Sequence, residues 1–162
     1  MEAISKATLL DVHFEKVIAE LGPGSDLPRG GKIETEVSTS ALNEKNSENR
    51  AVVKVELKAI AVSSEAKTDD EFSYRIIVEC VGLYDWSSLD KRPDLNDEPT
   101  TRALSAPLYV LATEEAKYLV RRMNMGNLNL PWDLSSIEND EVAEKKQLKK
   151  TPTPSKRATK KR

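Results

Sequence analysis

Apolar and polar residues alternate with a period of two in four separate segments of the first half of the chain. These segments are Thr8 to Glu20, Lys32 to Ala41, Arg50 to Ser63 and Phe72 to Val81. Such alternation is typical of β-strands that bury one face. In the first segment the apolar positions change parity after Lys16, which predicts a bulge or a break there. Short polar turns separate the segments, so we expect an antiparallel meander.

After residues 82–97, which do not continue a strand comfortably, the period becomes helical. We expect a long helix from Ser105 to Met123, with Pro107 in the first turn, where proline is tolerated. Its apolar stripe consists of Leu108, Tyr109, Ala112, Ala116, Leu119, Val120 and Met123. A shorter helix is predicted from Asp133. Four antiparallel strands, a crossover loop, one long helix and one short helix define an α+β fold.

Two apolar residues of the predicted helix, Leu111 and Tyr118, fall on the side opposite to this stripe. A helix that packs only on its own sheet needs a single apolar stripe. We therefore expect Leu111 and Tyr118 to contact another subunit. The chain has 38% hydrophobic and 5% aromatic residues, which predicts a core of modest size. A subunit with a modest core often needs a partner to complete it, so this composition also favours an oligomer.

The charge is distributed unevenly along the chain. The net charge is −2, yet residues 143–162 hold nine Lys or Arg against one acid, a net charge of +8. The remaining residues therefore carry −10. This basic run also contains Pro152 and Pro154, so it predicts a disordered tail after one domain that spans residues 1–142.

The sequence offers few groups for catalysis. His13 lies on the polar side of the first strand, and Cys80 lies on the apolar side of the fourth. One His and one Cys cannot form a zinc site, and the glycines match neither a P-loop nor a dinucleotide fingerprint. We therefore expect no enzyme activity, no metal and no cofactor. A single Cys, no long apolar run and no secretory signal at the N-terminus favour a cytoplasmic protein with no membrane span.

The order of the elements and three short motifs resemble the SecB chaperone family. The motifs are Gly82-Leu83-Tyr84 after the last strand, Leu108-Tyr109 in the helix and Met125-Gly126-Asn127-Leu128-Asn129-Leu130-Pro131 after it. The resemblance covers about residues 8–142. It implies a homotetramer, built as a dimer of dimers, that acts as an ATP-independent holdase for unfolded or extended polypeptides. Members of the family serve protein export or protect antitoxins.

The resemblance also implies an apolar client groove between the sheet and the crossover loop. Its expected residues are Ile33, Val37, Leu83, Tyr84, Trp86, Leu128, Leu130 and Trp132. Exposed apolar patches of this kind are normally interaction sites. The alternative is that these side chains close the core of the monomer.

The chain departs from the pattern of export SecB proteins at two places. Arg75 and Ile77 stand where the family presents a leucine and a glutamate to the SecA motor, which weakens the expected docking of SecA. The basic tail allows an alternative function, a nucleic-acid-associated protein that binds through this tail. The acidic remainder and the absence of interleaved aromatic and basic residues make nucleic acid the weaker interpretation. A third interpretation is an assembly protein that kept the fold without binding clients.

Overall fold

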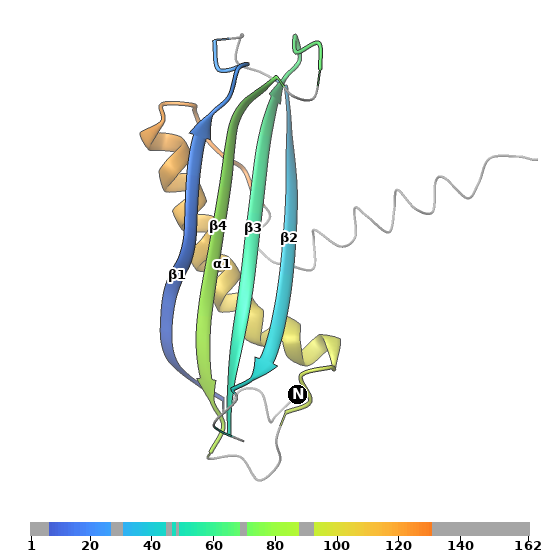
Figure 1. Ribbon diagram of the computed structural model, residues 1–162, viewed down its shortest axis with the longest axis vertical. Helices are drawn as coiled ribbons and strands as arrows, with labels where there is room; N and C mark the ends of the chain where they lie inside the picture. The colour runs from blue at the N-terminus through green and yellow to red at the C-terminus, as the bar shows by residue number, and fades with distance from the viewer. Residues whose placement is uncertain are drawn as a thin grey trace, which may run out of the picture.

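The computed structural model describes residues 7–26, 31–44, 47, 49–68, 71–87 and 93–130. Its elements are β1 (Thr8–Leu21), β2 (Gly31–Asn43), β3 (Arg50–Ser63), β4 (Phe72–Asp85) and α1 (Glu98–Arg122). The four strands form one antiparallel sheet, and α1 crosses one face of it diagonally (Figure 1). This arrangement confirms the predicted α+β class. The predicted short helix and the basic tail lie outside the described residues.

The strand order is β1-β4-β3-β2, which corrects the predicted meander. β2, β3 and β4 do follow one another, but β1 pairs with β4 instead of β2. The backbone after β1 continues along β4, because Gly22 and Gly24 donate hydrogen bonds of 3.0 Å to the carbonyls of Ser73 and Phe72. A Cβ atom at Gly22 would lie 2.2 Å from the Phe72 carbonyl oxygen, so this close approach requires glycine. β1 and β2 are therefore the two edges of the sheet.

β1 is an irregular edge strand. Its register with β4 shifts between Leu9 and Asp11 and again between Phe14 and Lys16. The second shift confirms the bulge predicted near Lys16. Bulges twist an edge strand and interrupt its row of backbone groups.

The core lies between α1 and the two central strands. Alternate side chains of β3 from Ala51 to Ala61 and of β4 from Tyr74 to Tyr84 point toward the helix. The helix contributes Leu104, Leu108, Tyr109, Ala112, Ala116 and Val120. Each large side chain buried here contributes roughly 1.5–3 kcal/mol. Because α1 packs mainly on β3 and β4, it covers little of the two edge strands.

The helix begins at Glu98, seven residues before the predicted start at Ser105. Asp97 is the N-cap, and its carboxylate accepts hydrogen bonds from the Thr100 amide at 3.1 Å and the Thr100 hydroxyl at 2.6 Å. Pro107 consequently lies inside the helix, not in its first turn. The first turns are polar and Pro107 was expected in the first turn, so the apolar periodicity did not reveal residues 98–104 as helical.

Candidate functional site

Four of the residues expected in the client groove are buried in this structure. Tyr84, Trp86, Leu128 and Leu130 expose 4%, 2%, 3% and 8% of their surface. β4 extends to Asp85 instead of ending near Val81, so Tyr84 continues the row of side chains that faces the helix. These four residues therefore close the core of the monomer, as the alternative interpretation holds. Trp132 lies outside the described residues.

The other expected residues lie on two different faces of the sheet. Ile33, which is 38% exposed, and the half-buried Val37 are on the helix side of β2, opposite Ala61 and Leu57 of β3. Leu83 is opposite Val52, on the far side of the sheet. The structure therefore brings Ile33 and Val37 together and separates Leu83 from them.

A cavity of about 200 Å3 opens beside Ile33. Its lining includes Ala61 and Tyr74 from the central strands and Met125 and Asn127 from the segment after α1. Burial raises the pKa of Tyr74, so its hydroxyl stays neutral and the floor of the cavity carries no charge there. The resemblance placed Leu128 and Leu130 in one groove with Ile33, but it did not single out Met125 and Asn127, which line the cavity.

The edge of the sheet beside this cavity is regular. All thirteen residues of β2 pair with β3 without a register shift, and in the described part of the chain no strand pairs with the other edge of β2. Beside the cavity β2 carries Lys32, Glu34 and Glu36, whereas from Val37 to Asn43 it has no charged residue, no proline and no glycine. β1 differs from β2 in its two register shifts, which interrupt its row of backbone groups. β2 is thus the edge that can accept an added strand.

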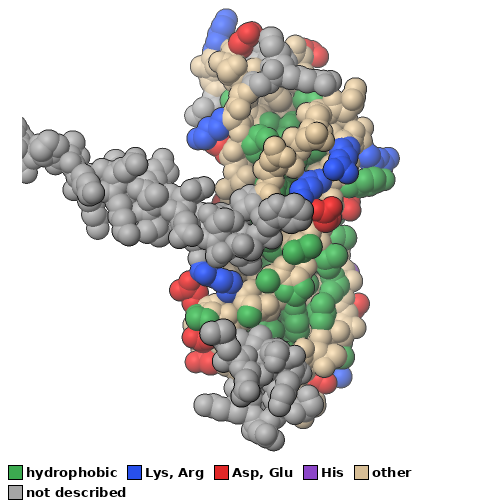
Figure 2. Space-filling view, turned by 180° about the vertical axis from the view of Figure 1, so that it is seen from behind, with side chains coloured by type: hydrophobic (Ala, Val, Ile, Leu, Met, Phe, Trp, Pro, Cys, Tyr) green, Lys and Arg blue, Asp and Glu red, His purple; other side chains and the backbone are tan. Residues whose placement is uncertain are grey.

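A second apolar surface is exposed on the helix side of β1. Leu9, Phe14 and Val17 are 37%, 41% and 42% exposed because α1 leaves this edge largely uncovered. Leu111 and Tyr118 are 41% and 52% exposed, as their position opposite the buried stripe predicts. Val110, which the sequence pattern did not single out, is 51% exposed. Figure 2 views this side of the molecule and shows hydrophobic side chains gathered mainly in its lower half.

The opposite face of the sheet is covered by ion pairs. Lys54 contacts the carboxylates of both Glu15 and Glu79, and it holds the pKa of Glu15 below its usual range. Arg75 lies 2.8 Å from Glu20, so its charge is paired. The charge of Arg75 is therefore neutralised locally on this face.

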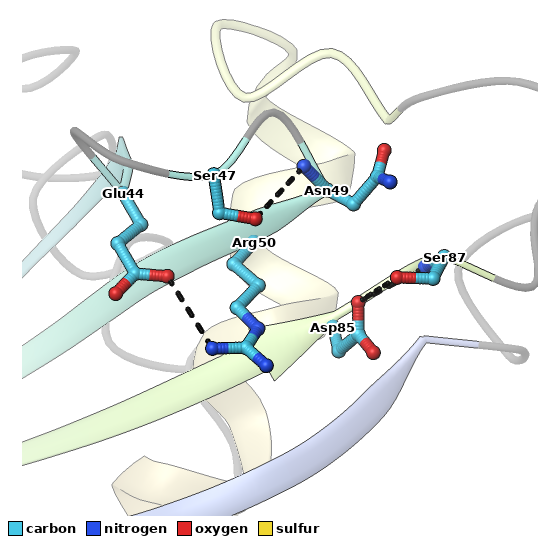
Figure 3. A network of polar contacts seen from close by, with 6 residues as sticks. All are labelled: Glu44, Ser47, Asn49, Arg50, Asp85 and Ser87. Atoms are coloured by element: carbon cyan, nitrogen blue, oxygen red, sulfur yellow. Dashed lines mark hydrogen bonds and ion pairs between the residues drawn. The ribbon is translucent and has the colours of Figure 1, made fainter.

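A polar network stabilises the end of the sheet where β3 begins (Figure 3). The Arg50 guanidinium lies 3.9 Å from the Glu44 carboxylate. The Ser87 amide and hydroxyl donate to the Asp85 carboxylate at 3.0 and 2.6 Å, and these bonds lower the pKa of Asp85. Asp85 and Ser87 satisfy each other locally, whereas Glu44 Oε2 is buried without a hydrogen-bond partner and only faces the Arg50 guanidinium.

The chemical groups singled out in the sequence do not form a reactive site. Cys80 is buried, and burial raises the pKa of its thiol. His13 is exposed beside Asp11, at 3.7 Å. Among the described residues there is no cluster of three His, Cys, Asp or Glu that could hold a metal ion. No helix in the described part of the chain is long and apolar enough to cross a membrane.

The comparisons with known proteins point to one fold. No family model matches the sequence, and no curated protein matches it. One matching solved structure is the Mycobacterium tuberculosis Rv1957 SecB-like chaperone in complex with a ChAD peptide from the Rv1956 HigA1 antitoxin. The TM-score is 0.58 at 16% identity, over 78% of this chain and 90% of that chain. The fold is SecB-like. A Streptococcus agalactiae protein of unknown function also matches, with a TM-score of 0.45 and 12% identity over 77% of this chain and 96% of that one.

Proposed function

We propose that this protein is an ATP-independent holdase that binds extended segments of unfolded polypeptides and prevents their aggregation. The observation that carries the proposal is the open β2 edge beside the apolar surface of Ile33 and Val37 and the adjoining cavity. The SecB-like fold supports it, and the peptide bound to the structural neighbour gives it a precedent in another protein.

This geometry would let the protein bind clients of different sequence. A client strand pairs with the backbone of β2, which requires no particular sequence, and every second client side chain then points toward the helix side. A large apolar side chain placed beside Ile33 enters the cavity. Each added backbone hydrogen bond contributes about 1 kcal/mol net. Such weak, additive contacts allow release without nucleotide hydrolysis.

We further propose that the protein acts in the cytoplasm, where it would protect an antitoxin or assist protein export. Docking to SecA is the less favoured part, because Arg75 is paired with Glu20 and this pair offers no net negative charge to a basic partner.

We also propose a homo-oligomer, a dimer of dimers, in which the exposed side of α1 meets another subunit. Leu111 and Tyr118 supply apolar surface there. Replacing both with Arg is expected to lower the particle mass measured by light scattering while the far-ultraviolet circular dichroism stays unchanged. A parent protein that is already monomeric would contradict this part of the proposal.

The deciding experiment follows the aggregation of a chemically denatured model enzyme by light scattering, without nucleotide. The protein is expected to suppress scattering near stoichiometric ratio, and Ile33→Asp is expected to abolish most of the effect. Leu42→Asp is the matched control, because Leu42 is 69% exposed on the opposite face of the same strand. The proposal fails if the folded protein does not suppress aggregation or if both variants behave alike.

Removing residues 143–162 separates the holdase from the alternative function. The holdase is expected to keep its activity without the basic tail. Salt-dependent binding of nucleic acid that disappears with the tail, together with no suppression of aggregation, would favour the nucleic-acid interpretation.

A further inference from the structure

The open edge of β2 presents a regular row of backbone groups (Figure 1). Where the β2–β3 ladder ends, the Glu44 amide donates to the Arg50 carbonyl at 3.0 Å, so the backbone groups of Glu44 point toward β3. Neighbouring residues of a strand point these groups to opposite sides, and β2 has no register shift. The amides and carbonyls that point away from β3 therefore belong to Gly31, Ile33, Thr35, Val37, Thr39, Ala41 and Asn43.

This row is nearly symmetric about its middle residue. β2 spans Gly31–Asn43, so Val37 is at its centre. On the helix side, a threonine stands two residues from Val37 in both directions, and an apolar residue, Ile33 or Ala41, stands four residues away. A strand with this symmetry presents the same surface to a copy of itself that runs antiparallel to it around a two-fold axis at Val37.

The charged residues of β2 favour this register. With the two Val37 residues opposite each other, both Glu34 and Glu36 lie opposite serines of the other copy. Registers centred on Thr35 or on Glu36 place glutamate directly opposite glutamate, which is destabilising. Registers centred nearer the C-terminal end of β2 pair fewer residues. The two copies of Glu36 are diagonal neighbours across the axis, and Lys58, at 3.6 Å, offsets part of their charge.

We propose that the open edge of β2 pairs with β2 of a second copy of this chain, antiparallel and centred on Val37. Thr35 then faces Thr39 of the second copy, and Ile33 faces Ala41, which are cross-strand pairs that stabilise a sheet. The outward-pointing residues from Ile33 to Ala41 form about ten backbone hydrogen bonds, because each hydrogen-bonded pair exchanges two. The sheet continues through both copies, and neither β2 edge remains open.

This pairing has a consequence for client binding. A client strand and a second copy use the same backbone groups of β2, so each excludes the other. The exclusion rests on the proposed function, whereas the pairing itself does not. Because pairing joins two molecules, the apparent affinity for clients falls as the concentration of the protein rises.

Cysteine cross-linking of the full chain tests the register in the absence of any client. Opposite Cα atoms of a hydrogen-bonded antiparallel pair lie about 5.5 Å apart, within the range of a disulfide. Oxidised glutathione is therefore expected to convert Val37→Cys into a covalent dimer on a non-reducing gel. The parent is expected to give none, because its Cys80 is buried.

Thr35→Cys is the matched control, because Thr35 and Val37 are both half-buried on the same face of β2. In the proposed pair the two Thr35 positions are offset by four residues, roughly 14 Å, which no disulfide spans. The double variant Thr35→Cys with Thr39→Cys is expected to cross-link again, since these two positions face each other. Equal yields from Thr35→Cys and Val37→Cys, or no cross-link in variants whose circular dichroism matches the parent, would overturn the inference.

The aggregation assay separates this inference from the proposed function. The oxidised Val37→Cys dimer is expected to lose most of the suppression that its reduced form shows, and the parent with oxidised glutathione controls for the oxidant. Equal suppression by the two forms would overturn the exclusion of clients. If the cross-link forms and neither form suppresses aggregation, the pairing stands and the proposed function fails. If no cross-link forms while the parent suppresses aggregation, the pairing fails and the holdase stands.

Discussion

The hydroxyl of Tyr84, on β4, donates a 2.6 Å hydrogen bond to the backbone carbonyl of Leu104, on α1. The bond is buried, and it lies one turn before Pro107, which stays within the helix but has no amide proton to donate to it. The helical partner of the Ala103 carbonyl is missing for the same reason. Tyr84 therefore ties the central strand to the part of the helix whose own hydrogen bonding is weakest.

Replacing Tyr84 with Phe is expected to lower the free energy of unfolding by about 1 kcal/mol, because it removes one buried hydrogen bond and preserves the ring. Urea denaturation followed by circular dichroism measures the change. Ser64→Ala is the control, since Ser64 is exposed in the turn after β3, and its effect should stay within about 0.5 kcal/mol. Equal effects of the two substitutions would show that the bond does not stabilise the fold.

The same tyrosine predicts sensitivity to alkaline pH. Burial raises the pKa of Tyr84 to about 12, above the ordinary value of 10.0. The folded state favours the neutral phenol, so this contribution to stability is complete below about pH 10 and is lost as the pH rises toward 12. Unfolding midpoints in urea between about pH 8 and 11 are expected to fall less steeply for Tyr84→Phe than for the parent. Parallel curves would contradict this assignment.

The strands were largely predictable from the sequence because apolar side chains alternate along one face of each, although on β1 that face is mostly exposed. The alternation in β3 and β4 is regular, since α1 covers their inner faces completely. The strand order was not predictable from the alternation of apolar and polar residues, because this alternation does not show which strand pairs with which. The decisive contact is the approach of Gly22 to Phe72, which the sequence shows only as part of a glycine-rich turn.

The candidate site was predictable only in part. Ile33 and Val37 were correctly placed on one face of one strand, because they are four residues apart and side chains alternate between the two faces of a strand. Tyr84 and Trp86 were expected in an open groove, and they are buried because β4 continues past Val81. The cavity wall formed by Met125 and Asn127 depends on how the chain returns after α1, and no local pattern specifies that path.

Two glycines provide a matched pair for testing the start of β2. Gly31 has a φ of 150°, and a Cβ atom there would lie 2.0 Å from the Val62 carbonyl oxygen. Gly126 has a φ of 95°, with nothing within 4 Å of its Cβ position. Gly126→Ala is expected to cost about 1 kcal/mol of conformational strain. Gly31→Ala should cost clearly more, because backbone must move as well.

Chemical denaturation of both glycine variants measures the difference, and a client-binding assay adds a second consequence. Gly31 lines the cavity beside Ile33, so displacement of the β2 start should also weaken binding. Equal stability losses in the two variants would mean that β2 moves away from β3 at little cost.

Pairing of a client with β2 can be tested on the client instead of the protein. A short synthetic peptide that alternates leucine and threonine is expected to bind, and methylation of every second backbone nitrogen removes the donors along one edge of its strand. Methylation of the intervening nitrogens removes those along the other edge. One of the two methylated peptides should bind at least about tenfold more weakly, since several bonds of about 1 kcal/mol are lost, and the other should bind nearly as well as the parent. Equal affinities of the two methylated peptides would show that the client is held by its side chains alone.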